Sequence, residues 1–196
     1  MTSDTTKQVT DVRTLRAIVH PRRIRLLSLL RLEGPATATA LARRTGESSG
    51  ATSYHLRQLA RFGYVEEDGP QRGRERRWRA STRTTSWNPA DFADDPEGLA
   101  VSDALERRQV HLAVRQFEAW MALRSGTGAA WLGAATQGDE ILRLTPSQTR
   151  AFTDELYTVV RRFRTDPPAA RPGEDTRFVA VYLQALPFEQ LEDLDR

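Results

Sequence analysis

Polar side chains able to bind a ligand are concentrated in residues 48–58, SSGATSYHLRQ. The stretch combines hydroxyl, imidazole, guanidinium and amide groups, all of which can donate hydrogen bonds to an anion or another polar ligand. Gly50 and Ala51 lie among them. Because small side chains bury little apolar surface, a helix that begins with them gains little core and leaves room for a partner near its backbone. The candidate binding residues are Ser48, Ser49, Thr52, Ser53, Tyr54, His55, Arg57 and Gln58.

Basic residues are distributed unevenly along the 196-residue chain. Residues 1–83 contain 17 Lys and Arg against 8 Asp and Glu, whereas residues 84–196 contain 12 against 18. The formal net charge of +3 therefore conceals a basic N-terminal part and an acidic C-terminal part. This asymmetry suggests that the N-terminal part meets a polyanion, although a solvated basic surface would give the same counts.

The polar stretch is predicted to lie on the second helix of a helix-turn-helix. Apolar residues at helical spacing, together with their capping residues, predict helices over 21–33, 37–44 and 50–62. Gly46 lies in the tight turn between the last two helices, where glycine allows a left-handed conformation. After Gly63, the sequence predicts two short strands joined by a basic loop, GPQRGRERRWRAS.

A short helix, a turn, a second helix and a basic hairpin together make a winged helix-turn-helix, whose second helix enters the major groove of DNA. Residues 11–83 resemble the ArsR-type winged-helix transcriptional regulators through the motifs HPRRIRLLSLL, TSYHLRQLARFGYVEE and GRERRWRAS. The resemblance implies that Ser53 and His55 lie on the recognition helix and that the eight candidate residues above face DNA. It also implies that the loop arginines contact the DNA backbone or minor groove, these being Arg72, Arg74 and Arg76. Tyr54 and His55 could instead be packed within the domain.

The expected fold is mainly α with a small β content. We expect a winged helix-turn-helix over residues 11–83, a linker rich in Pro, Asp and Asn over 84–97, and a C-terminal α/β region over 98–190. The C-terminal region is predicted to run helix–strand–helix–strand, with strands in DEILRL and RFVAVYLQALP. These two strands are expected to pair, with a helix over 146–163 on one face.

The long helix from about residue 99 to 123 carries an unusually wide apolar face, and we interpret it as a dimerisation surface. Winged-helix modules generally bind inverted repeats as two-fold dimers, because the symmetry of the protein must match that of the half-sites. The alternative is that the helix packs wholly inside its own C-terminal domain. The candidate dimerisation residues are Val101, Leu105, Leu112, Phe117 and Trp120.

Aromatic residues of the C-terminal region have two interpretations: a pocket for a small apolar effector, or plain core. They are Trp120, Trp131, Phe152, Tyr157 and Tyr182. No metal is expected, because the chain has no cysteine and its three histidines are far apart in sequence. No phosphate loop, nucleophile elbow or metalloprotease motif is present, so neither an enzyme nor a cofactor is expected.

No uninterrupted apolar run approaches the ~20 residues that cross a bilayer, and the first residues do not resemble a signal peptide, so a cytoplasmic protein is expected. These observations predict a homodimeric bacterial repressor that binds double-stranded operator DNA, with repression implied by the resemblance alone. The alternative is a winged-helix protein-interaction module without specific DNA binding. RNA binding is disfavoured, because no stacked-aromatic sheet or KH-type loop is evident.

Overall fold

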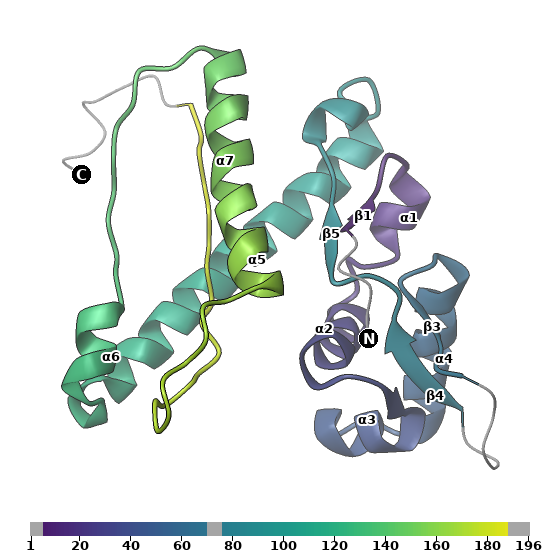
Figure 1. Cartoon of the computed structure of the whole chain (residues 1–196). Helices are drawn as coiled ribbons and strands as arrows, with labels where there is room; N and C mark the ends of the chain where they lie inside the picture. Colours follow the sequence, from purple (N-terminus) through teal and green to yellow (C-terminus); the bar gives the residue numbers. More distant parts are fainter. Residues whose placement is uncertain (1–5, 70–75, 188–196) are drawn as a thin grey trace. The chain divides into compact units, whose positions relative to one another are not determined.

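The computed structural model describes residues 6–69 and 76–187 and divides the chain into two compact units, residues 1–111 and 112–196. The first unit contains the helices that precede the hairpin (Figure 1). They are α1 (Val12–Arg16), α2 (Pro21–Glu33), α3 (Ala38–Thr45) and α4 (Ser49–Arg61). The three helices expected from the sequence are therefore present with nearly the expected bounds.

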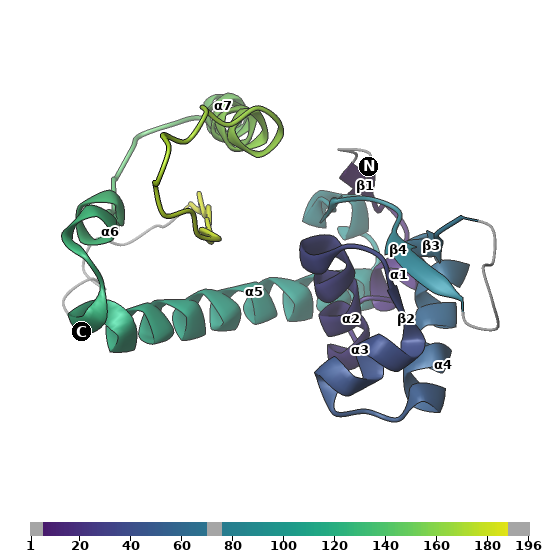
Figure 2. The ribbon, with the colours of Figure 1, turned by 60° about the horizontal axis from the view of Figure 1, so that its bottom comes forward.

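A small antiparallel sheet lies beside these helices. Its strands follow the order β2 (Ala36–Thr37), β4 (Arg77–Ala80) and β3 (Val65–Glu67). Val65 is paired with Ala80 and Ala36 with Trp78. Figures 1 and 2 show the β3–β4 hairpin next to α4, and α3 also packs against that helix. The mainly α fold with an N-terminal winged helix-turn-helix is thus confirmed.

The core of the first unit is built from leucines of α1, α2, α3 and α4 around the fully buried Tyr64. The hydroxyl of Tyr64 donates a hydrogen bond of 2.9 Å to the backbone oxygen of Thr14, and burial raises the pKa of this phenol. Arg31 of α2 donates to the Thr82 backbone oxygen at 3.0 Å and to the Thr85 hydroxyl at 2.8 Å. Burial lowers the pKa of Arg31 to about 10, and the two hydrogen bonds tie α2 to the chain leaving the hairpin.

Residues 84–97, expected to be a linker, contribute to the first unit. β5 (Thr84–Ser86) pairs in parallel with β1 (Thr6–Gln8). The 3-10 helix η1 (Pro89–Phe92) follows, and its Phe92 is only 2% exposed. The segment therefore packs into the unit that contains the winged helix-turn-helix.

Helix α5 (Pro96–Leu123) extends from the first unit into the second. Leu105 is buried in the core of the first unit and Val101 packs against that core. The expectation that Leu105 forms a dimer surface is therefore wrong, because its side chain is already covered within its own chain. Leu112 and Phe117 are exposed and Trp120 is half-buried, so the outer part of the predicted apolar face stays uncovered.

The regular secondary structure of the second unit, in the residues that the structure describes, is helical. After α5 and the 3-10 helix η2 (Arg124–Gly126) come α6 (Ala129–Ala134) and α7 (Pro146–Thr165). Thr145 begins α7 with a capping box, in which its hydroxyl accepts from the Gln148 backbone while the Gln148 side chain accepts from the Thr145 backbone.

The prediction of two strands in residues 139–144 and 177–187 is wrong. Both segments lie outside any strand, and neither is hydrogen-bonded to the other within the described part of the chain. A strand needs a neighbouring strand for its backbone groups, and neither segment has one here. In the described ranges, the C-terminal region is thus helical rather than α/β. No described helix is long and apolar enough to cross a membrane.

Candidate nucleic-acid interface

The turn between α3 and α4 is fixed by capping interactions on both sides. The Thr37 hydroxyl accepts a hydrogen bond of 3.2 Å from the Ala40 backbone at the start of α3. Gly46 ends that helix in the left-handed region, at a φ of 73°, where glycine carries no steric penalty. The Ser48 hydroxyl then accepts from the Ala51 backbone at 3.2 Å and caps α4. These contacts set the direction in which the polar side chains of α4 project.

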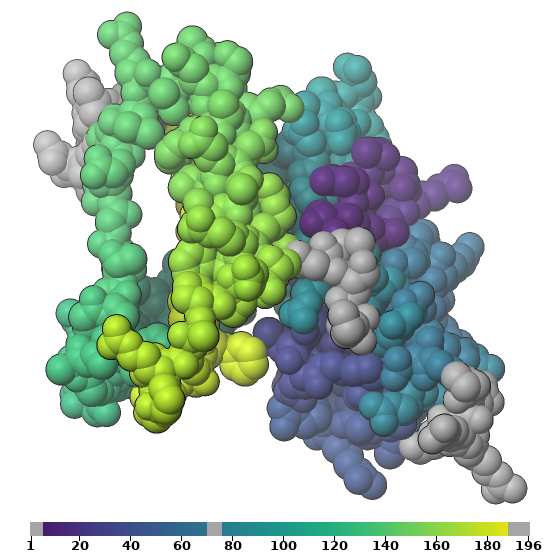
Figure 3. Space-filling model, viewed as in Figure 1, coloured from purple at the N-terminus to yellow at the C-terminus, as the bar shows by residue number. Residues whose placement is uncertain are grey.

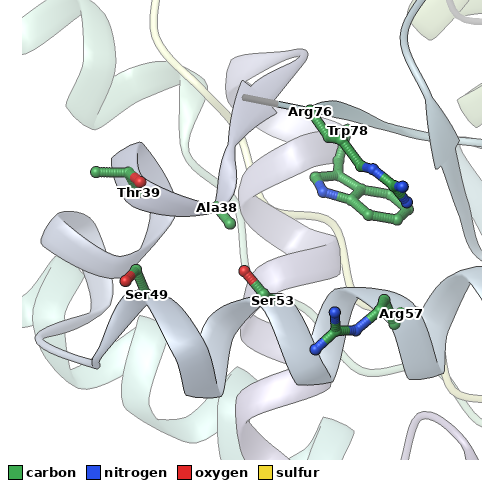
Figure 4. Close-up of a pocket in the computed structure, with 7 residues that line it drawn as sticks. All are labelled: Ala38, Thr39, Ser49, Ser53, Arg57, Arg76 and Trp78. Carbon is green, nitrogen blue, oxygen red and sulfur yellow. The ribbon is translucent and has the colours of Figure 1, made fainter. Parts of the chain in front are cut away.

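One side of α4 lines a recess of about 390 Å³ between α3, α4 and the hairpin. Figure 4 shows Ser49, Ser53 and Arg57 in a row along α4, one turn apart, with their side chains directed toward the recess. The other lining residues are Ala38 and Thr39 of α3 together with Arg76 and Trp78 at the hairpin. The recess therefore combines hydroxyl and guanidinium groups from three elements, a donor set suited to phosphate oxygens.

Other candidate residues of α4 are accessible without lining the recess. Tyr54 is 54% exposed and Gln58 is half-buried, while Ser48 is exposed with its hydroxyl engaged in the cap. Arg72 and Arg74, expected in the wing, lie outside the described residues. The exposed side of α4 thus retains most of the polar groups that the sequence singled out.

The prediction that Thr52 and His55 lie on the exposed binding side of α4 is wrong, because both side chains face inward. Their exposed fractions are 1% and 8%, and they share the buried side of α4 with Leu56 and Leu59. Residues spaced three and four apart lie on one side of a helix, so a helix that buries Leu56 and Leu59 also buries these two. Thr52 and His55 therefore pack α4 against the core and do not belong to its exposed side.

His55 meets a second histidine that lies at the start of α2. The ring centroids of His20 and His55 are 4.7 Å apart. The Nδ1 atom of His20 caps α2 by accepting a hydrogen bond of 3.2 Å from the Arg22 backbone, which requires that nitrogen to be unprotonated. Burial lowers the pKa of both imidazoles, and the nearby Arg22 and Arg23 lower them further, while Glu47 acts in the opposite direction. The pair thus favours the neutral form of both rings.

This arrangement predicts that the first unit loses stability in mild acid. A histidine whose pKa is lower in the folded state contributes stability that is complete above its unfolded pKa of about 6.5 and decreases as the pH falls below that value. We expect the thermal midpoint to fall between pH 7.5 and a pH of about 5. Differential scanning calorimetry across that range measures it.

The matched variants for this test are His20→Asn and His111→Asn. Asparagine at position 20 keeps a capping oxygen but cannot titrate, so the pH dependence should become shallower. His111 is an exposed residue of α5, and its replacement should leave the pH dependence in place. Equal pH profiles for wild type and His20→Asn would contradict the assignment.

Two basic residues in the described part of the hairpin form ion pairs with β3. Arg76 lies 2.9 Å from Glu67, and Arg79 lies 2.9 Å from Glu66. Such exposed pairs contribute about 0–1 kcal/mol, so a phosphate can replace the carboxylate at low cost. Arg57, in contrast, is exposed and has no acidic partner among the described residues. Arg57 is therefore the positive charge of the recess that no described carboxylate neutralises.

Three residues of the recess were not identified from the sequence: besides Ala38 at the start of α3, they are Thr39 and Trp78. Thr39 lies in the first turn of α3, and Trp78 lies on β4 paired with Ala36. Neither has a sequence signal of its own, because only the packing of α3 and β4 brings them next to α4.

The geometry defines a winged helix-turn-helix, and comparison with known proteins is consistent with this class. Residues 18–67 match the family model described as a helix-turn-helix domain. This is the range that holds α2, α3, α4 and β3. No curated protein matches the chain.

Three solved structures are similar to about half of the chain. One is a homodimeric winged helix-turn-helix DNA-binding domain from Mycobacterium bovis, described as a possible ArsR-family regulator. It is 23% identical to this chain, and the match covers 52% of this chain and 76% of that one, with a TM-score of 0.34. A second is the crystal structure of a possible transcriptional regulatory protein from the same organism. It is 23% identical, covers 52% of this chain and 88% of that one, and has a TM-score of 0.35. The third is reduced HlyU from Vibrio cholerae, which is 24% identical. The match covers 50% of this chain and 86% of that one, with a TM-score of 0.33.

Proposed function

We propose that this protein is a sequence-specific, double-stranded-DNA-binding transcriptional regulator that acts as a homodimeric repressor of the ArsR type. The observation that carries the proposal is the recess in which Ser49, Ser53 and Arg57 of α4 meet Arg76 of the hairpin. A phosphate of the DNA backbone would lie in this recess, and the start of α4 would enter the major groove beside it.

The charge distribution supports a polyanionic partner. Residues 1–83 hold an excess of basic residues, and several of them lie on α3, on α4 and at the hairpin. Phosphate contacts fix the position of a protein on the duplex, whereas contacts with base edges give sequence specificity. In this arrangement Ser49, Ser53, Arg57 and Arg76 hold the phosphate and position the domain, and the exposed Tyr54 lies nearest to the bases.

Arg57→Ala tests the phosphate role directly. We expect about tenfold weaker binding to an operator selected from a random duplex library, equivalent to about 1.4 kcal/mol. The slope of log affinity against log salt concentration should decrease by about one, because one phosphate contact and its released counterion are lost. Fluorescence anisotropy with a labelled duplex, titrated at several salt concentrations, measures both quantities.

The matched control is Arg107→Ala, which removes the same charge from the exposed side of α5, where Arg107 pairs with Asp103 at 3.5 Å. This variant should keep the affinity and the salt slope of the wild type. Equal losses in both variants would show that net charge alone governs binding and would contradict the proposed position of Arg57.

A winged-helix protein-interaction module is the second candidate function. Selection of duplexes from a random library distinguishes the two, since an operator reader enriches an inverted repeat and an interaction module enriches nothing. An apolar effector stays a prediction. Of its expected residues, Phe152, Tyr157 and Tyr182 are exposed, so a ligand would have to cover them rather than enter a closed core.

A further inference from the structure

The start of α2 holds α4 in place through two contacts. The rings of His20, at the N-cap of α2, and His55, on the buried side of α4, have their centroids 4.7 Å apart. Two residues further along α2, Arg22 pairs at 2.7 Å with Glu47, which lies in the turn before α4. The first turn of α2 is thus joined both to α4 and to the segment that sets the direction of α4.

A third attachment joins α2 to α3. The Arg25 guanidinium donates to the backbone oxygens of Arg44 and Thr45, at 3.4 and 3.5 Å, where α3 ends. Figure 3 shows the dark blue residues of α2 and α3 side by side at the surface of the first unit. Because arginine keeps its charge at any pH near neutrality, this attachment does not respond to mild acid, whereas the histidine pair does.

Histidine is the side chain whose ordinary pKa allows it to change charge between pH 5 and 8. The chain contains three histidines and no cysteine, and two of the three form this pair. The third, His111, is an exposed residue of α5. The contact between α2 and α4 therefore holds most of the side chains that titrate in mild acid.

A proton on His20 disrupts the beginning of α2. The Nδ1 atom accepts a hydrogen bond of 3.2 Å from the Arg22 backbone, and a protonated Nδ1 can only donate. The imidazolium would also lie at the N-terminus of α2, where the helix dipole disfavours a cation. The first turn of α2, PRRI, contains no acidic residue, and Glu47 is already paired with Arg22.

A proton on His55 is unfavourable for a different reason. The side chain is 8% exposed, and its Nδ1 atom has no hydrogen-bond partner in the described part of the chain. An imidazolium carries a proton on both ring nitrogens, so the Nδ1 proton would be buried without an acceptor. The contact between the two rings is therefore compatible with their neutral forms.

The groups around the pair oppose its protonation. Burial is the largest cause of the lowered pKa of both imidazoles, and Arg23 and Arg22 of α2 add to it, while Glu47 of the turn acts in the opposite direction. Within the described residues, α3 and the β3–β4 hairpin add no charge that acts on either ring. On α4 itself, Tyr54 meets the His55 ring edge-on at 5.4 Å. Acid therefore favours separation of the two rings.

We propose that the His20–His55 contact is a proton switch: uptake of a proton separates the start of α2 from α4 and weakens operator binding, while the core of the first unit stays folded. The inference adds regulation to the proposed function and rests on that function for the operator. The polar side chains of α4 line the recess, so a change in the direction of α4 moves them relative to Arg76 of the hairpin.

The sign of the pH effect distinguishes this switch from ordinary binding to a polyanion. DNA phosphates favour protonation of nearby groups, so a basic surface binds DNA more tightly in acid. The switch acts in the opposite direction, because the neutral pair belongs to the binding form, which is lost as the pH falls below the ordinary histidine pKa of about 6.5. Each proton taken up on release changes the affinity by at most about tenfold per pH unit.

Operator binding at about pH 7.5 and about pH 5.5, measured by fluorescence anisotropy at one salt concentration, tests the switch. Wild type should bind about tenfold more weakly at the lower pH. The double variant His20→Asn/His55→Gln has polar side chains that do not titrate, so its affinities at the two pH values should agree within about threefold. His111→Asn should keep the full difference of the wild type.

Amide hydrogen exchange of the free protein gives a second readout that needs no DNA. After correction for the intrinsic pH dependence of exchange, α4 and the first turn of α2 should lose protection at about pH 5.5, while β3 and β4 keep theirs. This local loss in a wild type that binds no selected duplex at any pH would contradict the proposed function and leave the switch in place. If the double variant does not fold, the exchange of the wild type decides.

Three results overturn the switch. The first is an operator affinity that stays equal or rises in acid, and the second is an equal loss of affinity in the wild type and the double variant. The third is an exchange pattern in which α4 keeps its protection, or in which the whole first unit loses protection together. In the last case the acid effect would be global unfolding and not a local release of α4.

Discussion

Replacing Phe92 with alanine is expected to lower the free energy of unfolding of the first unit by about 3–5 kcal/mol. The side chain is 2% exposed and belongs to the same core as Leu105 of α5. Packing around it is tight: a Cβ atom added at Gly98 would lie 2.7 Å from the Phe92 ring. Removing the ring would leave a cavity that the surrounding helices cannot fill without moving.

Urea unfolding followed by circular dichroism measures this loss, with Leu32→Ala as the control. Leu32 is also apolar and lies in the first unit, on α2, but it is 63% exposed, so its truncation should cost less than about 0.5 kcal/mol. If Phe92→Ala is no less stable than Leu32→Ala, residues 84–97 act as a linker and do not belong to the folded unit.

The same segment shows what local composition cannot reveal. Residues 84–97 are rich in Pro, Asp and Asn, and this composition predicts a linker. Their structure depends on the pairing of Thr84 with Thr6, two residues 78 positions apart. Parallel pairing of two three-residue strands leaves no signal in either one alone, because each is too short for a periodic pattern.

The helix-turn-helix was predictable because its signals are local. Caps, glycine turns and the helical spacing of leucines all lie within a few residues of the structure they determine, and the structure places them as expected. The spacing of Ser49, Ser53 and Arg57 by four residues likewise predicts one shared side of α4. Thr39 and Trp78 could not be found in this way, since they reach the recess from other elements.

For Thr52 and His55 the sequence did contain the relevant signal. With Leu56 and Leu59 inward, helical spacing also directs positions 52 and 55 inward, and the structure buries both. Their polar character predicts a binding role, but their position on the helix predicts burial, and position decides. The extended segments at 139–144 and 177–187 are a different case, because strand propensity is local but the partner strand is not.

The second large effect is expected at Gly50, in the first turn of α4. Gly50 is exposed, and a Cβ atom added there would meet nothing within 4 Å, so the folded protein has room for a side chain. Gly50→Glu should leave stability unchanged or slightly higher, because a carboxylate near a helix N-terminus interacts favourably with the helix dipole. It should weaken binding to the selected operator at least about 100-fold.

The physical reason is the position of the new charge. If the start of α4 enters the major groove, the carboxylate lies beside the DNA phosphates. Two like charges 4 Å apart repel by about 1–4 kcal/mol over the range from bulk water to a protein surface. The longer side chain also holds the helix backbone away from the base edges. Both effects act on the complex and neither acts on the free protein, so binding and stability should separate.

Two control variants separate the effect of the larger side chain from the effect of the added charge. Gly50→Ala adds a methyl group without charge and should keep the operator affinity within a few-fold of wild type. Ala100→Glu adds the same charge to an exposed position on α5 and should keep it too. Anisotropy titrations and thermal melts of all three variants provide the comparison. If Gly50→Glu binds the operator as tightly as Ala100→Glu, the small residues at the start of α4 do not mark a surface that approaches DNA, and the interaction-module hypothesis becomes the better explanation of this helix.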